Sequence, residues 1–181
     1  MFKRFYPVLV LSAICLASGL SLSLLWKASV KKIAKNENLS IEKAIFELDT
    51  RVHRFESNKH ERLLYYGYDK NNILVSKFYM LSGNGFQGVI KILVSLAPDL
   101  SNVQGIQVLE QTETPGLGSK IAAAPFLDSF KSLPILDSLI VCKKKTGDKN
   151  RGEIQAVTGA TISSKAVVDI INDKIKAIKD E

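Results

Sequence analysis

Four hydroxyl side chains and a glycine stand together where a helical pattern opens near the end of the chain, in the segment TGATISS that begins at Thr158. The N-terminus of a helix leaves backbone N–H groups unpaired, and the aligned peptide dipoles make that end positive. A phosphate group is stabilised at such an end, and Thr158 and Ser163 could donate further hydrogen bonds to it. The alternative is that Thr161 or Ser163 only caps the helix, which is the usual role of hydroxyl residues there. The residue types alone leave both interpretations open.

A second loop, ETPGLGSK from Glu113 to Lys120, could bring backbone close to a flat ligand. Pro115-Gly116 is a strong turn signal, and Gly118 allows a conformation closed to other residues. Leu117 is then an apolar side chain on a loop, with the Thr114 hydroxyl nearby. An apolar tip with polar neighbours suits a ring system with polar edges. The alternative is a structural turn with one buried leucine.

Other kinds of site lack the residues that they need. Two distant cysteines and two histidines, His53 and His60, have no zinc-ligand spacing, and we expect both histidines at the surface or at a strand edge. There is no dinucleotide-binding or Walker-type glycine motif, and no histidine accompanies Ser163 or Ser164 as a hydrolase would require. The net charge of +7 is spread along the chain, without the basic cluster that nucleic acid needs. We therefore predict no catalytic residue, no metal site and no nucleic-acid partner.

The segment from Phe5 to Trp26 contains no charged residue. As a helix it would be about 33 Å long, which matches a hydrocarbon core of about 30 Å. Tyr6 and Trp26 stand near its two ends, where interfacial aromatic residues are common. A cleaved signal peptide is the alternative, but its apolar core is typically about 7–15 residues and we find no small-x-small cleavage site. The pattern favours a retained single-span anchor.

The basic residues beside this segment do not fix its orientation. They precede and follow it closely, at Lys3, Arg4, Lys27, Lys31, Lys32 and Lys35. Counting positive charge therefore gives no clear answer. A disulfide between Cys15 and Cys142 is excluded by geometry, because Cys15 would lie in the membrane.

The remaining patterns predict an α+β fold: a single transmembrane helix, then one domain with a mixed or antiparallel sheet and flanking helices. The amphipathic residues of the last helix run from Ala166 to Ile178. A strand at 88–97 is apolar enough to be covered on both faces. The other expected elements are a hairpin over 62–81, a strand at 103–112, a helix at 125–133, and short strands at 138–144 and 152–157.

These elements give a predicted domain organisation in four parts. They are a short segment at 1–4, the transmembrane helix at 5–26, a helical linker at 27–50 with Ser40 as a possible cap, and the folded domain at 51–181.

The two loops, in this order and behind one membrane span, resemble the G subunit of Rnf-type electron transport complexes. The C subunit of sodium-pumping NADH:quinone reductases shares the same FMN-binding domain. The run NGFQGVIKILVSL is also similar to the Gly-aromatic-x-Gly strand before the first loop in that family. The resemblance covers most of residues 60–175.

In that family FMN is attached through its phosphate to the last threonine of the Ser/Thr-Gly-Ala-Thr segment, and Thr161 holds that position here. The resemblance implies a covalently attached FMN whose phosphoester lies at the helix N-terminus and whose ring lies against the first loop. The further cofactor contacts that it implies are Thr158, Gly159, Ala160, Ser163, Glu113, Thr114, Leu117 and Gly118.

One position departs from the family pattern. An acidic residue often stands six positions before the modified threonine, and here that residue is Gln155. Glutamine keeps the shape and a hydrogen-bonding carbonyl but loses the charge. We expect the substitution to be tolerated because the rest of the segment matches closely.

The resemblance also implies partners and a location. A separate flavin transferase, with FAD as donor, makes the attachment outside the cytoplasmic membrane. The domain would then face the periplasm or the cell exterior. The expected function is an electron carrier within a complex that couples NADH and ferredoxin to Na⁺ or H⁺ movement. Its expected partners are a multi-span flavin subunit and iron–sulfur subunits, which would contact Ser18, Gly19 and Ser21 on the span.

Two alternatives remain at this point. One is the C subunit of the quinone reductase, whose chains tend to be longer than 181 residues. The other is a membrane-anchored module that binds a phosphate-bearing ligand without redox chemistry.

Overall fold

The computed structural model describes residues 2–58, 61, 63–135, 138–143 and 147–180. The chain divides into two compact units, Met1–Ser40 and Ile41–Glu181.

The N-terminal unit is helical throughout its described residues. Helix α1, Phe2–Leu48, runs without a break through the predicted membrane span and most of the predicted linker. Ser40 lies inside this helix and caps nothing, because no glycine or proline between Lys27 and Leu48 interrupts it. By length and composition it is the one helix among the described residues that could span a membrane, with a mean hydropathy of 2.3 in its apolar window.

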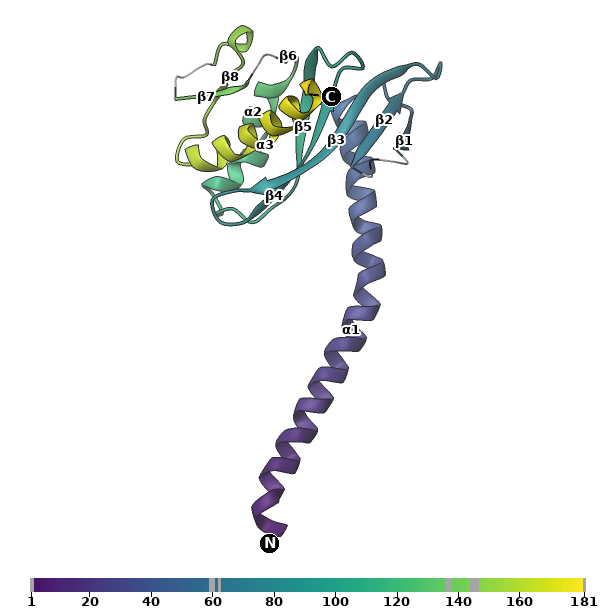
Figure 1. The fold of residues 1–181 in the computed structure, drawn as a ribbon, viewed down its shortest axis with the longest axis vertical. Helices are drawn as coiled ribbons and strands as arrows, with labels where there is room; N and C mark the ends of the chain where they lie inside the picture. The colour runs from purple at the N-terminus through teal and green to yellow at the C-terminus, as the bar shows by residue number, and fades with distance from the viewer. Residues whose placement is uncertain (1, 59–60, 62, 136–137, 144–146, 181) are drawn as a thin grey trace. The chain divides into compact units, whose positions relative to one another are not determined.

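The second unit is built on a six-stranded antiparallel sheet in which each strand pairs with the next along the chain (Figure 1). The strands are β1 Arg54–Ser57, β2 Leu64–Tyr68, β3 Leu74–Asn84, β4 Val89–Leu96, β5 Asn102–Gln111 and β6 Leu133–Pro134. The predicted strands β2, β3, β4 and β5 are confirmed, whereas β1 and β6 were not predicted.

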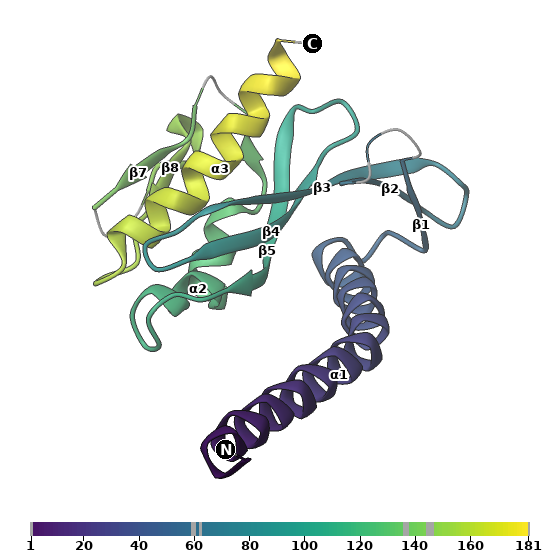
Figure 2. The same cartoon turned by 60° about the horizontal axis from the view of Figure 1, so that its bottom comes forward.

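Both faces of this sheet are covered. On one face β3 and β4 pack against α3, Thr161–Lys179 (Figure 2). The core on this face contains Ile92, Val94 and Ile171. On the other face Leu93 packs with Ile45, which belongs to the last turns of α1. Strand β4 is therefore covered on both sides, as its continuous apolar run predicted.

The segment predicted as one helix over 125–133 is broken into shorter pieces. Helix α2 covers only Ala124–Leu127, and a 3₁₀ turn, η2, follows at Asp128–Phe130. The Ser129 hydroxyl donates to the Phe126 carbonyl at 2.5 Å, and Ser132 has a φ of 56°. This local hydrogen bond and the left-handed residue end the helix early, although the expected apolar positions Phe126 and Phe130 are buried.

A separate two-stranded parallel sheet precedes the last helix. It pairs β7, Ile140–Cys142, with β8, Glu153–Gln155, at two positions where short strands were predicted. There are two further 3₁₀ turns. Turn η1, Gly118–Ala122, lies between β5 and α2, and turn η3, Lys149–Arg151, lies between β7 and β8.

The cysteines and histidines can be placed in part. Cys15 and Cys142 are both free, as expected. His53 is exposed at the entry to β1, which confirms its surface position, and His60 lies outside the described residues.

Candidate functional site

The turn before α3 presents an uncapped helix N-terminus. Gly159 has a φ of 80°, Ala160 occupies the N-cap position, and no side chain caps the helix. Thr161 is the first helical residue, so the interpretation of Thr161 or Ser163 as the N-cap is wrong. Because the first N–H groups of a helix have no intrahelical acceptor, this end remains a site for an anion.

Ser164 fixes the shape of this turn. Its hydroxyl accepts a hydrogen bond from the Val157 N–H at 3.0 Å and donates to the Ala160 carbonyl at 2.9 Å. The side chain is fully buried. From the sequence, Ser164 was considered only as a hydrolase nucleophile and was excluded for lack of a histidine. Its role in the turn depends on tertiary geometry that the sequence does not display.

The loop after β5 forms a tight turn with its leucine outside. The Thr114 carbonyl accepts hydrogen bonds from the Leu117 and Ser119 N–H groups at 3.2 and 3.1 Å. Gly116 has a φ of 75°, a conformation that glycine adopts without strain. Leu117 is 48% exposed, so the alternative of a buried structural leucine is wrong.

A buried carboxylate, Glu113, joins the two loops. It is 4% exposed, and its Oε2 accepts a hydrogen bond from the Ser163 hydroxyl at 2.5 Å. Its Oε1 accepts from the Gln87 N–H at 3.0 Å, which ties in the loop between β3 and β4. Glu113 therefore connects three segments that are far apart in the sequence.

The surroundings of Glu113 favour its ionised form. Burial raises the pKa of this carboxyl, but hydrogen bonds from Ser163 and from the loop backbone, including Gln87, outweigh burial and lower the pKa overall. A methyl group on Gly118 would lie 2.7 Å from Oε2 of Glu113 and 2.8 Å from the Ser163 hydroxyl. The missing side chain at Gly118 is thus what lets the two loops meet.

The two loops enclose a cavity of about 360 Å³, and nearly all the site residues predicted from sequence line it. The exception is Thr158, which lines a different cavity of about 530 Å³. Phe86 and Ile162 line the first cavity without having been predicted as site residues, although Phe86 is the aromatic residue of the Gly-aromatic-x-Gly run. The lining residues are Phe86, Glu113, Thr114, Leu117, Gly118, Gly159, Ala160, Thr161, Ile162 and Ser163.

The lining combines hydroxyl groups with exposed apolar surface. The Thr161 hydroxyl has no hydrogen-bond partner among the described residues, whereas the proton of Ser163 is already donated to Glu113. Phe86, Leu117 and Ile162 are 60%, 48% and 60% exposed. Apolar side chains that gather around one cavity and stay exposed are typical of a ligand site.

Comparison with known proteins agrees with this geometry. The model of the FMN-binding domain matches residues 85–176, which include both loops. The G subunit of an ion-translocating oxidoreductase complex of Methanosarcina acetivorans is 36% identical over 113 residues, which are 62% of this chain and 56% of the relative. The G subunit of the Na⁺-translocating ferredoxin:NAD⁺ oxidoreductase complex of Acetobacterium woodii is 34% identical over 67% of this chain and 58% of its own. The match thus spans little more than half of either relative.

A solved structure shows the same fold. NqrC of Shewanella oneidensis aligns with a TM-score of 0.54 and 21% identity over 73% of this chain and 75% of its own. It confirms the predicted α+β class with an antiparallel sheet. Because the family model covers half of the sequence and the predicted site residues of both loops, the chain belongs to the FMN-binding domain family.

Proposed function

We propose that this chain carries FMN covalently on Thr161 and serves as an electron-carrying subunit of an Rnf-type, ion-translocating oxidoreductase complex. The observation that carries the proposal is the Thr161 hydroxyl. It has no partner among the described residues, and it stands at an uncapped helix N-terminus on the cavity that the two loops form.

The turn before α3 fits a phosphoester. The N-terminal N–H groups and the helix dipole would stabilise its negative charge. Gly159 has no side chain to crowd the phosphate, and among the described residues the one atom found within 4 Å of the place of its Cβ belongs to the Leu117 side chain, at 3.1 Å. In the attachment the Thr161 oxygen would form a bond to the FMN phosphorus of FAD, with AMP and the hydroxyl proton as the leaving species.

The rim of the cavity fits a flat ring. Phe86, Leu117 and Ile162 offer apolar surface on three different segments, and Thr114 contributes a polar group beside them. FMN would supply reversible one- and two-electron transfer. The residues of the chain would hold the ring, exclude water from its apolar face and, through the ionised Glu113, add negative charge near it.

The relatives indicate the setting in which this chemistry would be used. Both are G subunits of ion-translocating oxidoreductase complexes, so we infer partners of the same kind here, a multi-span flavin subunit and iron–sulfur subunits. Helix α1 would anchor the chain in the cytoplasmic membrane. The domain would face the periplasm or the exterior, where a separate flavin transferase would modify it. The coupling ion would be Na⁺ or H⁺.

Co-expression with a flavin transferase tests the proposal. We expect denatured full-length protein to retain flavin fluorescence in a gel and to gain the mass of one FMN phosphoester. Thr161→Ala should abolish both signals. The matched control is Ser57→Ala, which removes an exposed hydroxyl on β1 outside the cavity and should leave attachment intact.

Two results would contradict the proposal. One is native protein without covalent flavin, and the other is an adduct that persists in Thr161→Ala. A circular dichroism melt of that variant verifies that it remains folded. Flavin fluorescence and the mass of the native chain report whether Gln155 is tolerated.

A further inference from the structure

Strand β3 extends beyond its neighbour β2 and leaves part of one edge unpaired. The pairing of β3 with β2 ends at Leu64↔Tyr79, followed by one hydrogen bond from the Met80 N–H to the Leu63 carbonyl at 2.8 Å. On its other side β3 stays paired with β4 as far as Asn84↔Val89. Among the described residues, the last part of β3 therefore has a partner on one side only.

The backbone groups at this edge point away from β4. In an antiparallel sheet the N–H and C=O groups of successive residues alternate between the two neighbouring strands. Because Met80 bonds toward β2, Ser82 and Asn84 direct their backbone groups to the same, open side. Strand edges of this kind are often protected by proline or a charged residue, and the sequence from Leu81 to Asn84 has neither.

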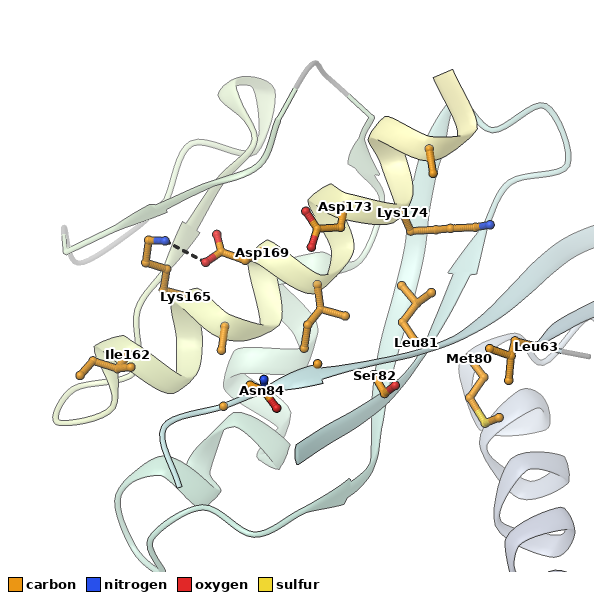
Figure 3. Close-up of a pocket in the computed structure, with 15 residues that line it drawn as sticks. Leu63, Met80, Leu81, Ser82, Asn84, Ile162, Lys165, Asp169, Asp173 and Lys174 are labelled. Carbon is orange, nitrogen blue, oxygen red and sulfur yellow. Dashed lines mark hydrogen bonds and ion pairs between the residues drawn. The ribbon is translucent and has the colours of Figure 1, made fainter. Parts of the chain in front are cut away.

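A groove of about 660 Å³ runs between this edge and helix α3 (Figure 3). Strand and helix approach closely at Gly83, where a Cβ would lie 2.5 Å from Ile170. From β3 it is lined by residues 80–84, and its charged residues on α3 are Lys165, Asp169, Asp173 and Lys174.

One acidic side chain that lines the groove has no ion pair among the described residues. Lys165 is paired with Asp169 at 2.8 Å, and Lys174 with Glu61 at 3.0 Å. Asp173 has no ion pair among the described residues. A docked segment would gain most from a basic side chain opposite Asp173.

The groove adjoins the proposed flavin cavity. Ile162 lines both, and Gly85 in the groove is followed directly by Phe86 in the cavity. A chain seated in the groove would therefore end beside the flavin ring.

We propose that an extended segment of a partner polypeptide docks in this groove as an added strand on β3, with a basic side chain facing Asp173. The open backbone edge selects an extended chain, because only such a chain offers N–H and C=O groups at matching spacing. The inference rests on the proposed function in one respect: the partner is the component of the complex that exchanges electrons with the flavin.

Photo-crosslinking in native membranes tests this docking. The full chain would carry benzoylphenylalanine in place of Lys165, which lines the groove, or of Lys176, an exposed position on α3 outside it. We expect position 165, and not 176, to crosslink to one peptide of another protein of the complex that contains a basic residue. A crosslink to lipid or to a second copy of this chain, or equal yields at both positions, would overturn the docking proposal.

Substitutions at Ser82 and Asp173 distinguish strand addition from general proximity. Ser82→Pro removes the outward N–H and should lower the crosslink yield about tenfold, whereas Ser82→Ala keeps the N–H and should leave the yield unchanged. Asp173→Lys should also lower it, with Asp180→Lys as the control. Equal yields in Ser82→Pro and Ser82→Ala would rule out strand addition.

The flavin content of each variant separates this inference from the function on which it rests. Flavin bound without groove-dependent crosslinks refutes only the docking site. Absence of covalent flavin from the unsubstituted chain refutes the proposed function.

Discussion

Two buried carboxylates in the folded unit, Asp49 and Glu113, are stabilised in different ways. Asp49 is 6% exposed and follows α1 directly. Arg51 donates to both of its oxygens, from Nε at 2.9 Å and from Nη2 at 2.8 Å, and the Ser76 hydroxyl of β3 donates as well. Burial raises the pKa of Asp49, but the hydrogen bonds from Arg51 and Ser76 and the charge of Arg51 outweigh burial and lower the pKa overall.

Glu113 has no ion pair among the described residues. Its hydrogen bonds come from neutral groups, the Ser163 hydroxyl and the Gln87 N–H, and it lies on the cavity beside Thr161. Through its hydrogen bonds to Arg51 and Ser76, Asp49 holds the residues that follow α1 to strand β3. Glu113, without such a cation, leaves a net negative charge near the proposed cofactor. Removing Asp49 should therefore change stability alone, whereas removing Glu113 should change stability and the site together.

Asp49→Ala should have the largest effect on stability. It leaves the Arg51 side chain without its carboxylate acceptor and removes one of the two acceptors, Asp49 and Gln104, of the buried Ser76 hydroxyl, so we expect the free energy of unfolding to fall by about 3 kcal/mol. Urea denaturation measures this loss. Flavin attachment to Thr161 should be unchanged in folded protein. Glu56→Ala, which removes an exposed partner of Arg54, is the control and should cost less than about 0.5 kcal/mol.

Glu113→Ala should cost less stability but also disturb the site. The loss of two hydrogen bonds predicts a fall of about 2 kcal/mol, since the exposed Gln87 N–H can bind water while the buried Ser163 cannot. We expect slower flavin attachment at limiting transferase, measured by gel fluorescence over time. Glu113→Gln keeps one acceptor and should recover part of both losses. If flavin were attached to Glu113→Ala at the native rate, Glu113 would affect stability alone, as Asp49 is expected to do.

Acid should weaken both carboxylate clusters by less than either alanine substitution. The folded-state pKa values of Asp49 and Glu113 are both lowered, from ordinary values of 3.8 and 4.5. Their contribution is complete above those values and disappears as the pH falls through the lower, folded-state values. Stability measured by urea denaturation should decline below about pH 4.5. In Glu113→Gln this decline should be shallower, and an unchanged slope would contradict the assignment.

Ser163→Ala should have the smallest effect. The Ser163 hydroxyl proton is donated to Glu113, so we expect a loss of about 1 kcal/mol and little change in flavin attachment. A double-mutant cycle with Glu113→Ala measures the coupling between the two side chains. If attachment instead fails in Ser163→Ala while Glu113→Gln is normal, Ser163 contacts the phosphate directly.

Much of the fold was predictable because local patterns report how each segment is buried. The spacing of Val167, Ile171 and Ile175 predicted α3, and the uncharged run from Phe5 predicted a helix long enough to span a membrane. Pattern could not predict the early end of α2, because one serine hydrogen bond and one left-handed residue decide it. The four-part domain organisation stays a prediction.

The sequence alone singled out the candidate site residues: Thr161 at the start of a helix, and Leu117 between two glycines on a loop. Only the tertiary structure decided that Glu113 meets Ser163, fifty positions away, and that Phe86 joins them at one cavity. The tertiary structure also decided that β3 extends beyond the end of its pairing with β2 and has an open edge there. The reason is physical: composition and periodicity are properties of single segments, whereas these contacts depend on strand register and on close approach at Gly118 and Gly83.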